Sequence, residues 1–178
     1  PNITFIRGKV EKISDISDGA RVVTENEIYA AGKIFNSVIL NHEFEQQKKY
    51  PLLQQHFVGW FIQTKQDHFD ADMATFMDFR LPQRNNTRFM YILPTDKRTA
   101  LFEYTLFSEN LLEQKEYEEA IKAYLEEHQI RDYSIIETEK GSIPMTCFNF
   151  YKYNSRNILN IGTAGGWTKA STGYTFMN

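Results

Sequence analysis

Several features that mark large protein classes are scarce or missing in this sequence. Its 178 residues include a single cysteine, Cys147, which excludes an intrachain disulfide and a cysteine-based zinc site. No window approaches the roughly 20 apolar residues that a membrane-spanning helix needs. The 20 lysine and arginine residues face 23 aspartate and glutamate residues, and no basic run stands out. We therefore expect a cytoplasmic protein with no nucleic-acid partner and, at most, peripheral membrane contact.

Motifs of the common enzyme classes are also missing. The four histidines, His42, His56, His68 and His128, show no metal-ligand spacing, so no metal site is expected. The sequence has no G-x-S-x-G motif, no P-loop and no Cys/His pair, which excludes the common hydrolase and kinase interpretations. The G-x-G-x-x-G fingerprint is absent from all 178 residues, so any dinucleotide site formed by them alone is incomplete.

Aromatic side chains, in contrast, are abundant. They make up 15% of the residues, with 14 Phe, 10 Tyr and 2 Trp, and hydrophobic residues make up 42%. This apolar content is sufficient for one core, or for two small lobes sharing one, and it excludes disorder. The chain opens at Pro1 directly into a strand-like pattern and stops just after a glycine-rich turn. We expect a piece of a longer protein.

The order of the expected elements predicts an α+β fold. Short strands joined by turns are expected at residues 3–13, 20–24, 27–31 and 33–40. A polar stretch over 41–50 is expected to cross between two lobes. Long aromatic strands, typical of an antiparallel sheet joined by hairpins, follow at residues 56–65, 74–80, 88–95 and 98–107. A helix over 113–128 carries one apolar stripe and should cover that sheet. The remaining strands are expected at residues 133–138, 142–147 and 158–161, the first two separated by a turn at Gly141.

Glu103 is the first candidate for chemistry. Alternation along its strand places this carboxyl group on the same face as Leu101 and Phe107. Burial there raises the pKa of a carboxyl group and keeps a proton available near neutral pH, as a general acid requires. The alternatives are a solvated residue on an exposed face and an ion pair with Arg88 or Arg98.

Asp78 and Arg80 form the second candidate. Because they lie two positions apart in the sequence FMDFR, they are expected to share one face of their strand with Phe76. An adjacent acid and base most often form a structural ion pair. The functional alternative is a charged wall for an otherwise apolar cavity.

The third candidate is a glycine-rich segment near the C-terminus. Here a short apolar strand runs into two turns in which backbone N–H groups could approach a ligand closely, and a helix beginning after Ser171 would favour an anion or an electron-rich carbonyl. The alternative is an ordinary loop from strand to helix with Ser171 as its N-cap. The candidate ligand-binding residues are Gly162, Gly165, Gly166, Ser171, Thr172, Gly173 and Tyr174.

Four motifs, in this order along the chain, resemble those of the lycopene cyclases, which are flavin-dependent carotenoid enzymes of the aromatic-hydroxylase-like flavoprotein superfamily. Residues 76–80, FMDFR, are similar to F-M-D-W-R, and residues 101–105, LFEYT, are similar to F-L-E-E-T. Residues 143–145, IPM, and residues 171–174, STGY, match two further family segments. The resemblance covers 37–178 and is strongest to the bacterial branch. Tyr104, in place of the second acidic residue of F-L-E-E-T, departs from the pattern.

The resemblance implies how the chain is organised. Residues 1–40 would form part of a flavin-binding lobe, and residues 41–154 the substrate lobe, a mostly antiparallel aromatic-rich sheet covered by a helix. Residues 155–178 would supply a strand, a loop and a helix start that contact the flavin through the seven candidate residues above. The cofactor implied is FAD in its reduced form, with NAD(P)H as the reductant, and this piece alone is expected not to retain it.

The resemblance also implies an activity. Glu103 would be the acid that protonates the linear ψ end group of lycopene, which then closes to a ring, expected to be of the β type, with no net redox change. Asp78 and Arg80 would support this site. The enzyme would be an isomerase in contact with the inner membrane. Aromatic candidates for the cavity wall, which core packing would explain equally well, are Phe57, Phe61, Phe89, Tyr91 and Phe107. The alternatives are another FAD-dependent monooxygenase or lipid-chain reductase of the superfamily and a non-catalytic protein that binds a hydrophobic ligand.

Overall fold

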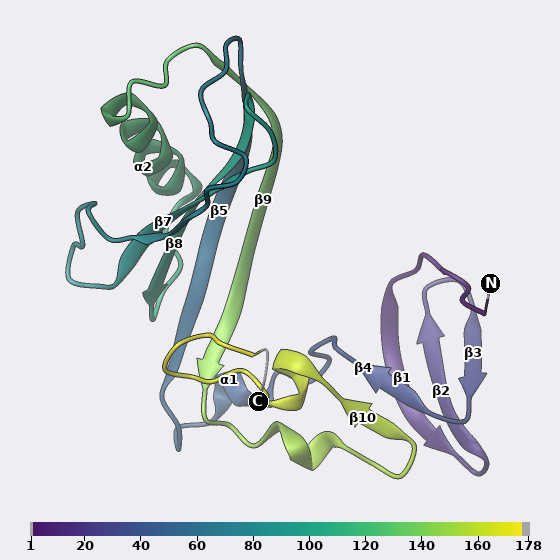
Figure 1. Ribbon diagram of the computed structural model, residues 1–178. Coiled ribbons are helices and arrows are strands. Elements are labelled where there is room, and N and C mark those ends of the chain that lie inside the picture. Colours follow the sequence, from purple (N-terminus) through teal and green to yellow (C-terminus); the bar gives the residue numbers. More distant parts are fainter. Residues whose placement is uncertain (1, 176–178) are drawn as a thin grey trace. The chain divides into compact units, whose positions relative to one another are not determined.

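The computed structural model describes residues 2–175, which divide into two compact units (Figure 1). The first unit combines both ends of the chain, up to Pro51 and from Thr146 onward, and the second unit is Leu52–Met145. The boundaries therefore differ from those expected at 40/41 and 154/155. Residues 41–51 and 146–154, expected in the substrate lobe, belong to the first unit.

The first unit contains a small antiparallel sheet and a parallel strand pair. The sheet has the order β1-β2-β3, with strands β1 (Val10–Ile16), β2 (Gly19–Thr24) and β3 (Ile28–Ala31). The parallel pair consists of β4 (Ile34–Asn36) and β10 (Ile158–Asn160). This pair joins the two ends of the chain, and the Asn36 side chain donates a buried hydrogen bond of 2.7 Å to Asn160 Oδ1.

Three short helical segments complete the described part of the first unit. They are α1 (Glu43–Gln46) and the 3-10 turns η1 (Phe150–Tyr153) and η2 (Gly162–Gly165). The polar stretch expected to cross between lobes thus contains a helical turn that packs inside the first unit. Its anchor is Phe44, which is buried, with its ring centroid 5.5 Å from that of Phe150.

The second unit is one five-stranded sheet with the order β6-β7-β8-β5-β9. Its strands are β5 (Leu52–Thr64), β6 (Thr75–Asp78), β7 (Arg88–Pro94), β8 (Thr99–Ser108) and β9 (Tyr133–Thr146). Strands β6, β7, β8 and β5 pair antiparallel, and β9 runs beside β5 in the opposite direction (Figure 1). The α+β fold and the mostly antiparallel aromatic sheet are therefore confirmed.

Helix α2 (Gln114–Glu127) covers one face of this sheet, as its apolar stripe predicts (Figure 1). The helix contributes Tyr117, Ile121, Tyr124 and Leu125, which are all buried. The strands contribute Val58, Trp60, Ile62, Met90, Ala100, Phe102, Tyr104 and Leu106. Because side chains alternate along a strand, the intervening residues project from the other side of the sheet, which we call the Glu103 face.

Strand β9 corrects one expectation. Instead of two strands with a turn at Gly141, the structure has one continuous strand through this glycine. The ring of Phe57 from β5 lies over Gly141, so that a Cβ atom there would come within 2.9 Å of Phe57 Cε1. The glycine therefore provides room for an aromatic ring, not a change of chain direction.

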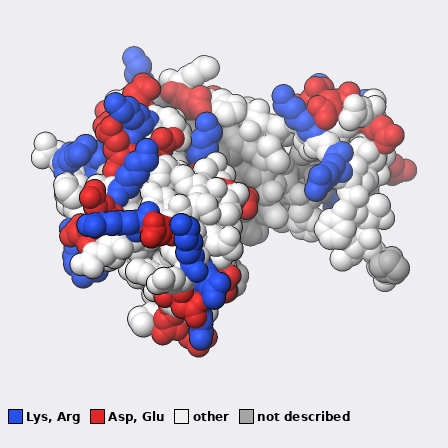
Figure 2. Space-filling model, turned by 90° about the horizontal axis from the view of Figure 1, so that it is seen from above, with Lys and Arg blue, Asp and Glu red and all other residues white. Residues whose placement is uncertain are grey.

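Charges of both signs are interspersed over the surface. On the face drawn in Figure 2, lysine and arginine side chains alternate with aspartate and glutamate side chains, in keeping with a formal net charge of −3. In the described part of the chain, no helix is both long enough and apolar enough to cross a membrane.

Candidate functional site

Glu103 lies at the centre of the five-stranded sheet. In the antiparallel register it stands opposite Gly59 of β5 on one side and opposite Tyr91 of β7 on the other. Strand β8 is paired on both edges, which fixes the backbone of Glu103 in the middle of the sheet. Its side chain projects from the Glu103 face, away from helix α2.

The Glu103 face is rich in aromatic side chains. By strand parity and register it carries all five residues expected for a cavity wall, namely Phe57, Phe61, Phe89, Tyr91 and Phe107. Phe89 is buried among its neighbours, with its ring centroid 5.1 Å from that of Tyr91 and 6.2 Å from that of Phe107. The acid candidate thus lies beside an apolar aromatic surface.

This environment changes the acidity of Glu103. Burial in the first place, and the neighbouring Glu139 in addition, raise the pKa of its carboxyl group to about 7, while a hydrogen bond from Thr105 acts in the opposite direction. The Thr105 hydroxyl group donates this bond to Glu103 Oε1 over 2.7 Å and is itself fully buried. Glu103 can therefore hold a proton near neutral pH, as the sequence pattern suggested.

Glu139 was not among the residues singled out from the sequence. It lies on β9 and reaches over Gly59, where a Cβ atom would come within 2.9 Å of both Glu139 Cγ and Glu139 Oε1. Its carboxyl group is close enough to that of Glu103 to raise the pKa of Glu103. The pairing of β9 with β5 brings the two carboxyl groups together, and nothing in the local sequence around Glu139 indicates this pairing.

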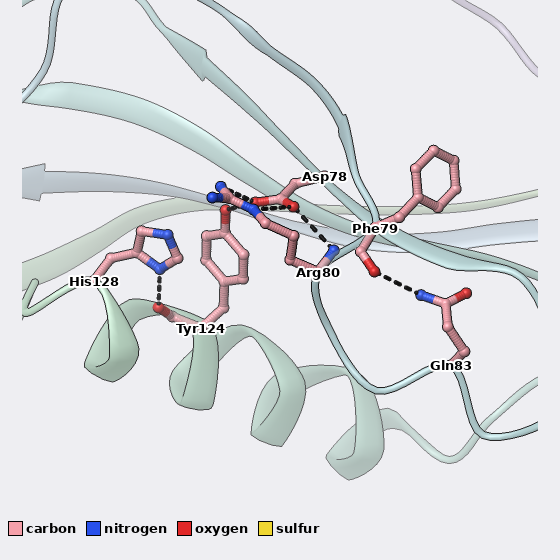
Figure 3. Close-up of polar contacts among 6 residues, drawn as sticks. All are labelled: Asp78, Phe79, Arg80, Gln83, Tyr124 and His128. Atoms are coloured by element: carbon pink, nitrogen blue, oxygen red, sulfur yellow. Dashed lines mark hydrogen bonds and ion pairs between the residues drawn. The ribbon is translucent and has the colours of Figure 1, made fainter.

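Asp78 and Arg80 form a bidentate ion pair at the edge strand β6 (Figure 3). The Arg80 guanidinium group lies 2.9 Å from Asp78 Oδ1 through Nε and 2.7 Å from Asp78 Oδ2 through Nη2. The hydroxyl group of Tyr124 on α2 donates a 2.6 Å hydrogen bond to Asp78 Oδ2. The Asp78 side chain is only 4% exposed, and the arginine bonds hold the pKa of its carboxyl group well below its usual range.

The side chains near this ion pair make contacts that support the fold. The His128 ring stacks on that of Tyr124 at a centroid distance of 4.1 Å and bonds to the Tyr124 carbonyl group, while Gln83 donates to the carbonyl group of Phe79 (Figure 3). The His128 contacts lie at the end of helix α2 and the Gln83 bond lies within the loop after β6, while the bond from Tyr124 to Asp78 joins β6 to the helix. They are the contacts of the structural ion pair that an adjacent acid and base most often form.

The structure does not bring Asp78 and Arg80 together with Glu103. The expectation that Asp78 shares a face with Phe76 is wrong, because Met77 adopts a left-handed backbone with φ 54° and the register between β6 and β7 shifts there. Phe76 consequently contacts Tyr91, which belongs to the Glu103 face, at a centroid distance of 5.4 Å, whereas Asp78 points to α2.

The glycine-rich segment forms closed turns in the first unit. The amide groups of Gly165 and Gly166 donate to the carbonyl groups of Ile161 and Thr163 and so are not free for a ligand, contrary to expectation. Gly165 is packed against the Asn160 carbonyl group, and Gly166 (φ 74°) lies beside Phe150. Gly162 differs: its φ is 58°, and in the described part of the chain no heavy atom outside its own turn and chain neighbours lies within 4 Å of where its Cβ atom would be.

The segment from Ser171 to Tyr174 is a turn closed on Lys169. The amide groups of Thr172 and Gly173 donate to the Lys169 carbonyl group over 3.1 and 2.9 Å, and the Lys169 amide group donates to the Tyr174 carbonyl group. The helix expected after Ser171 does not begin within residues 171–175, and residues 176–178 lie outside the described part.

A chain of threonine hydroxyl groups connects the two turns. Thr168 Oγ1 lies 2.9 Å from Thr163 Oγ1 and 2.8 Å from Thr175 Oγ1. Beside the first turn lies a cavity of about 210 Å³, lined by residues that include Asn36, Val38, Phe150, Asn160 and Ala164. The two candidate segments for ligand binding are thus linked to each other, and the first of them borders a cavity.

Comparison with known proteins identifies a matching family and solved structures with a similar fold. The family described as "Lycopene cyclase protein" matches residues 1–178. Several solved structures share its fold, including the following two. A geranylgeranyl bacteriochlorophyll reductase-like protein from Thermoplasma acidophilum matches with a TM-score of 0.58 and 15% identity, over 96% of this chain and 42% of that one. The halogenase PltM matches with a TM-score of 0.54 and 12% identity, over 93% of this chain and 38% of that one.

Both solved structures are longer than the part of them that matches this chain. This chain spans about two fifths of their length, and their low identity supports the common fold alone. A search of curated proteins found no match. The family match over the full chain, together with the ordered motifs, assigns this protein to the lycopene cyclase family.

Proposed function

We propose that the protein containing this chain converts the linear ψ end group of lycopene into a ring, with Glu103 as the proton donor. The observation that carries the proposal is a half-buried carboxyl group, with its pKa raised to about 7, at the centre of a sheet face rich in aromatic side chains. Family membership supplies the substrate class.

The reaction follows from the position of that proton. Glu103 transfers it to the terminal double bond, so that its O–H bond breaks, a C–H bond forms and positive charge develops on the neighbouring carbon. A second double bond attacks this carbon and closes the ring, and a base then removes a proton next to the new cation. One proton enters the substrate and one leaves, which makes the protein an isomerase with no net redox change.

The Glu103 face can stabilise the cation that forms. Aromatic rings carry negative charge on their faces and attract a cation without reacting with it, and Phe57, Tyr91 and Phe107 lie on strands around Glu103. The same apolar surface limits the access of water, which would otherwise trap the cation. We infer that these side chains hold the substrate end group against Glu103.

FAD is the cofactor that we propose for the whole protein, in its reduced form and with NAD(P)H as reductant. When bound, reduced FAD would supply negative charge that stabilises the cation. The first unit fits it in part: Gly162 leaves its backbone accessible, and the exposed Ser171–Thr172 turn lies next to the same segment. Gly165 and Gly166 serve the packing of the turn.

We also propose a peripheral position on the cytoplasmic side of the inner membrane, where carotenoids reside. Large apolar side chains around β6 and β7 remain exposed, including Met73 at 64% and Phe76 at 75%. Exposed residues of this kind are suited to shallow contact with a lipid surface.

Turnover in D₂O tests the proposed reaction. Because the carboxyl proton of Glu103 exchanges with solvent, each ring formed should carry one deuterium, and NAD(P)H should not be consumed in proportion to product. The similarity to a reductase-like protein favours one rival, a lipid-chain reductase of the same fold. Stoichiometric NAD(P)H consumption with loss of double bonds would support that rival and contradict the cyclase.

A further inference from the structure

Two carboxyl groups meet on the Glu103 face, and the proposed reaction has used only one of them. Glu139 of β9 lies over Gly59, which is the register partner of Glu103. We propose that Glu139 is a positioning residue of the site, whose carboxyl group shares a single proton with Glu103 across the space left by Gly59. This role rests on the proposed function of Glu103, whereas the pairing of the two groups does not.

The pairing depends on the absence of a side chain at one position. A Cβ atom on residue 59 would come within 2.9 Å of Glu139 Cγ and Oε1 and within 2.8 Å of Leu101 Cδ1, closer than such atoms normally approach. With glycine there, the Glu139 side chain can lie flat on β5 and reach β8. Any other residue at position 59 would push Glu139 away from Glu103.

Few other titratable groups face Glu103. Strand β5 presents Gly59, β7 presents Tyr91, and β8 itself presents Thr105. Strand β9 presents Glu139 and, by alternation, the exposed Glu137, and of these two only Glu139 affects the pKa of Glu103. Two carboxyl groups in contact cannot both ionise easily, and the first proton to be lost leaves the other held between them. We infer that one proton held between the two groups contributes to the raised pKa of Glu103.

A shared proton suits the proposed chemistry in two ways. Before protonation of the substrate, the charge on Glu139 keeps Glu103 protonated at a pH where an ordinary glutamate is ionised. After Glu103 has given up its proton, both carboxylates face the new cation, and their charge stabilises it. The proton lost by the ring cation at the end balances the one that Glu103 donated.

The experiment is a titration of Glu103 in the whole protein. Carbon-13 NMR of labelled glutamate carboxyl groups measures the pH at the midpoint of the Glu103 titration. The Glu103→Gln variant identifies the Glu103 signal, because that signal is missing from its spectrum. In Glu139→Gln, which keeps the shape and removes the charge, the midpoint of Glu103 should fall by about one pH unit. Glu137→Gln, an exposed residue two positions earlier on β9, serves as the matched control and should leave it unchanged.

Activity provides an independent measurement. The upper limb of the pH profile for cyclisation should move to lower pH in Glu139→Gln, by the same amount as the titration midpoint of Glu103. Glu139→Asp, which keeps a carboxyl group, should show a smaller shift than Glu139→Gln. An unchanged Glu103 midpoint in Glu139→Gln would overturn the proposal. If the whole protein forms no ring from lycopene at all, the proposed function fails, and the NMR midpoint still decides whether the two carboxyl groups share a proton.

Discussion

Gly59 and Glu103 are direct register partners on the antiparallel strands β5 and β8, and the missing side chain of Gly59 lets a second carboxyl group approach Glu103. This relationship ties the acid candidate to three strands of the sheet at once. Glu103 comes from β8, the space beside it from β5, and its carboxyl partner from β9. The site therefore depends on the sheet being assembled in the correct order.

Replacing Gly59 with alanine should destabilise the second unit. The added methyl group would overlap with Leu101 and Glu139, and overpacking of this kind costs about 1–3 kcal/mol. Urea unfolding measures the loss. Gly32→Ala is a suitable comparison, because nothing lies within 4 Å of its Cβ position, and its stability should stay close to that of the wild type. Equal effects at the two glycines would argue against close packing at Gly59.

Truncation of Ile121 tests whether helix α2 is part of the core. Its side chain is fully buried between the helix and the sheet, so Ile121→Ala should cost about 2–5 kcal/mol in the free energy of unfolding. Glu126→Ala alters an exposed position on the same helix and should have little effect. Comparable losses from the two variants would mean that the helix does not pack on this face.

The ion pair at β6 should make the protein sensitive to acid. Because the pKa of Asp78 is lowered in the folded state, the pair stabilises the protein above the ordinary aspartate value of about 3.9, and this stabilisation is lost as the pH falls below it. Asp78→Asn should lose about 1–3 kcal/mol at neutral pH and show less acid sensitivity. Asp67→Asn, which breaks an exposed pair with Arg98, should change little.

Glu103 should produce the opposite pH dependence. Its folded-state pKa of about 7 lies above the unfolded value of about 4.3, so the folded protein binds the extra proton between these limits. The wild type should therefore lose stability relative to Glu103→Gln as the pH rises from about 4 to about 7. Urea unfolding of both proteins across this range checks the sign. A stability difference that stays constant across this range would show that folding does not raise the pKa of Glu103.

Much of this arrangement can be predicted from the sequence, for physical reasons that particular residues illustrate. The apolar stripe of α2 and the alternation around Glu103 are local periodicities, and both are confirmed. The backbone at Met77 breaks the alternation in β6 and turns Asp78 to the helix, which no simple pattern indicates. The local sequence predicts a turn at Gly141, because it does not show that the ring of Phe57, from a strand distant in sequence, lies over this glycine.

Glu139 shows the same limit at the candidate site. Its importance depends on the pairing of β9 with β5, a contact between distant parts of the chain, and on the space at Gly59. At the glycines after β10, the local sequence predicts a ligand-binding feature that the folded chain does not provide. Their sequence suggested free amide groups, yet those of Gly165 and Gly166 are used within the turn.

The adjacent residues Glu103 and Tyr104 provide the most direct test of the central claim. Glu103 projects to the aromatic face, whereas Tyr104 is buried under α2, where its hydroxyl group accepts a hydrogen bond from Arg88 over 2.9 Å. The measurement is ring formation from lycopene by the whole protein, with flavin absorbance recorded for each variant. Glu103→Gln should abolish the cyclic product and leave flavin absorbance intact, while Tyr104→Phe should retain cyclisation. Cyclisation retained by Glu103→Gln would contradict the assignment of Glu103 as the acid.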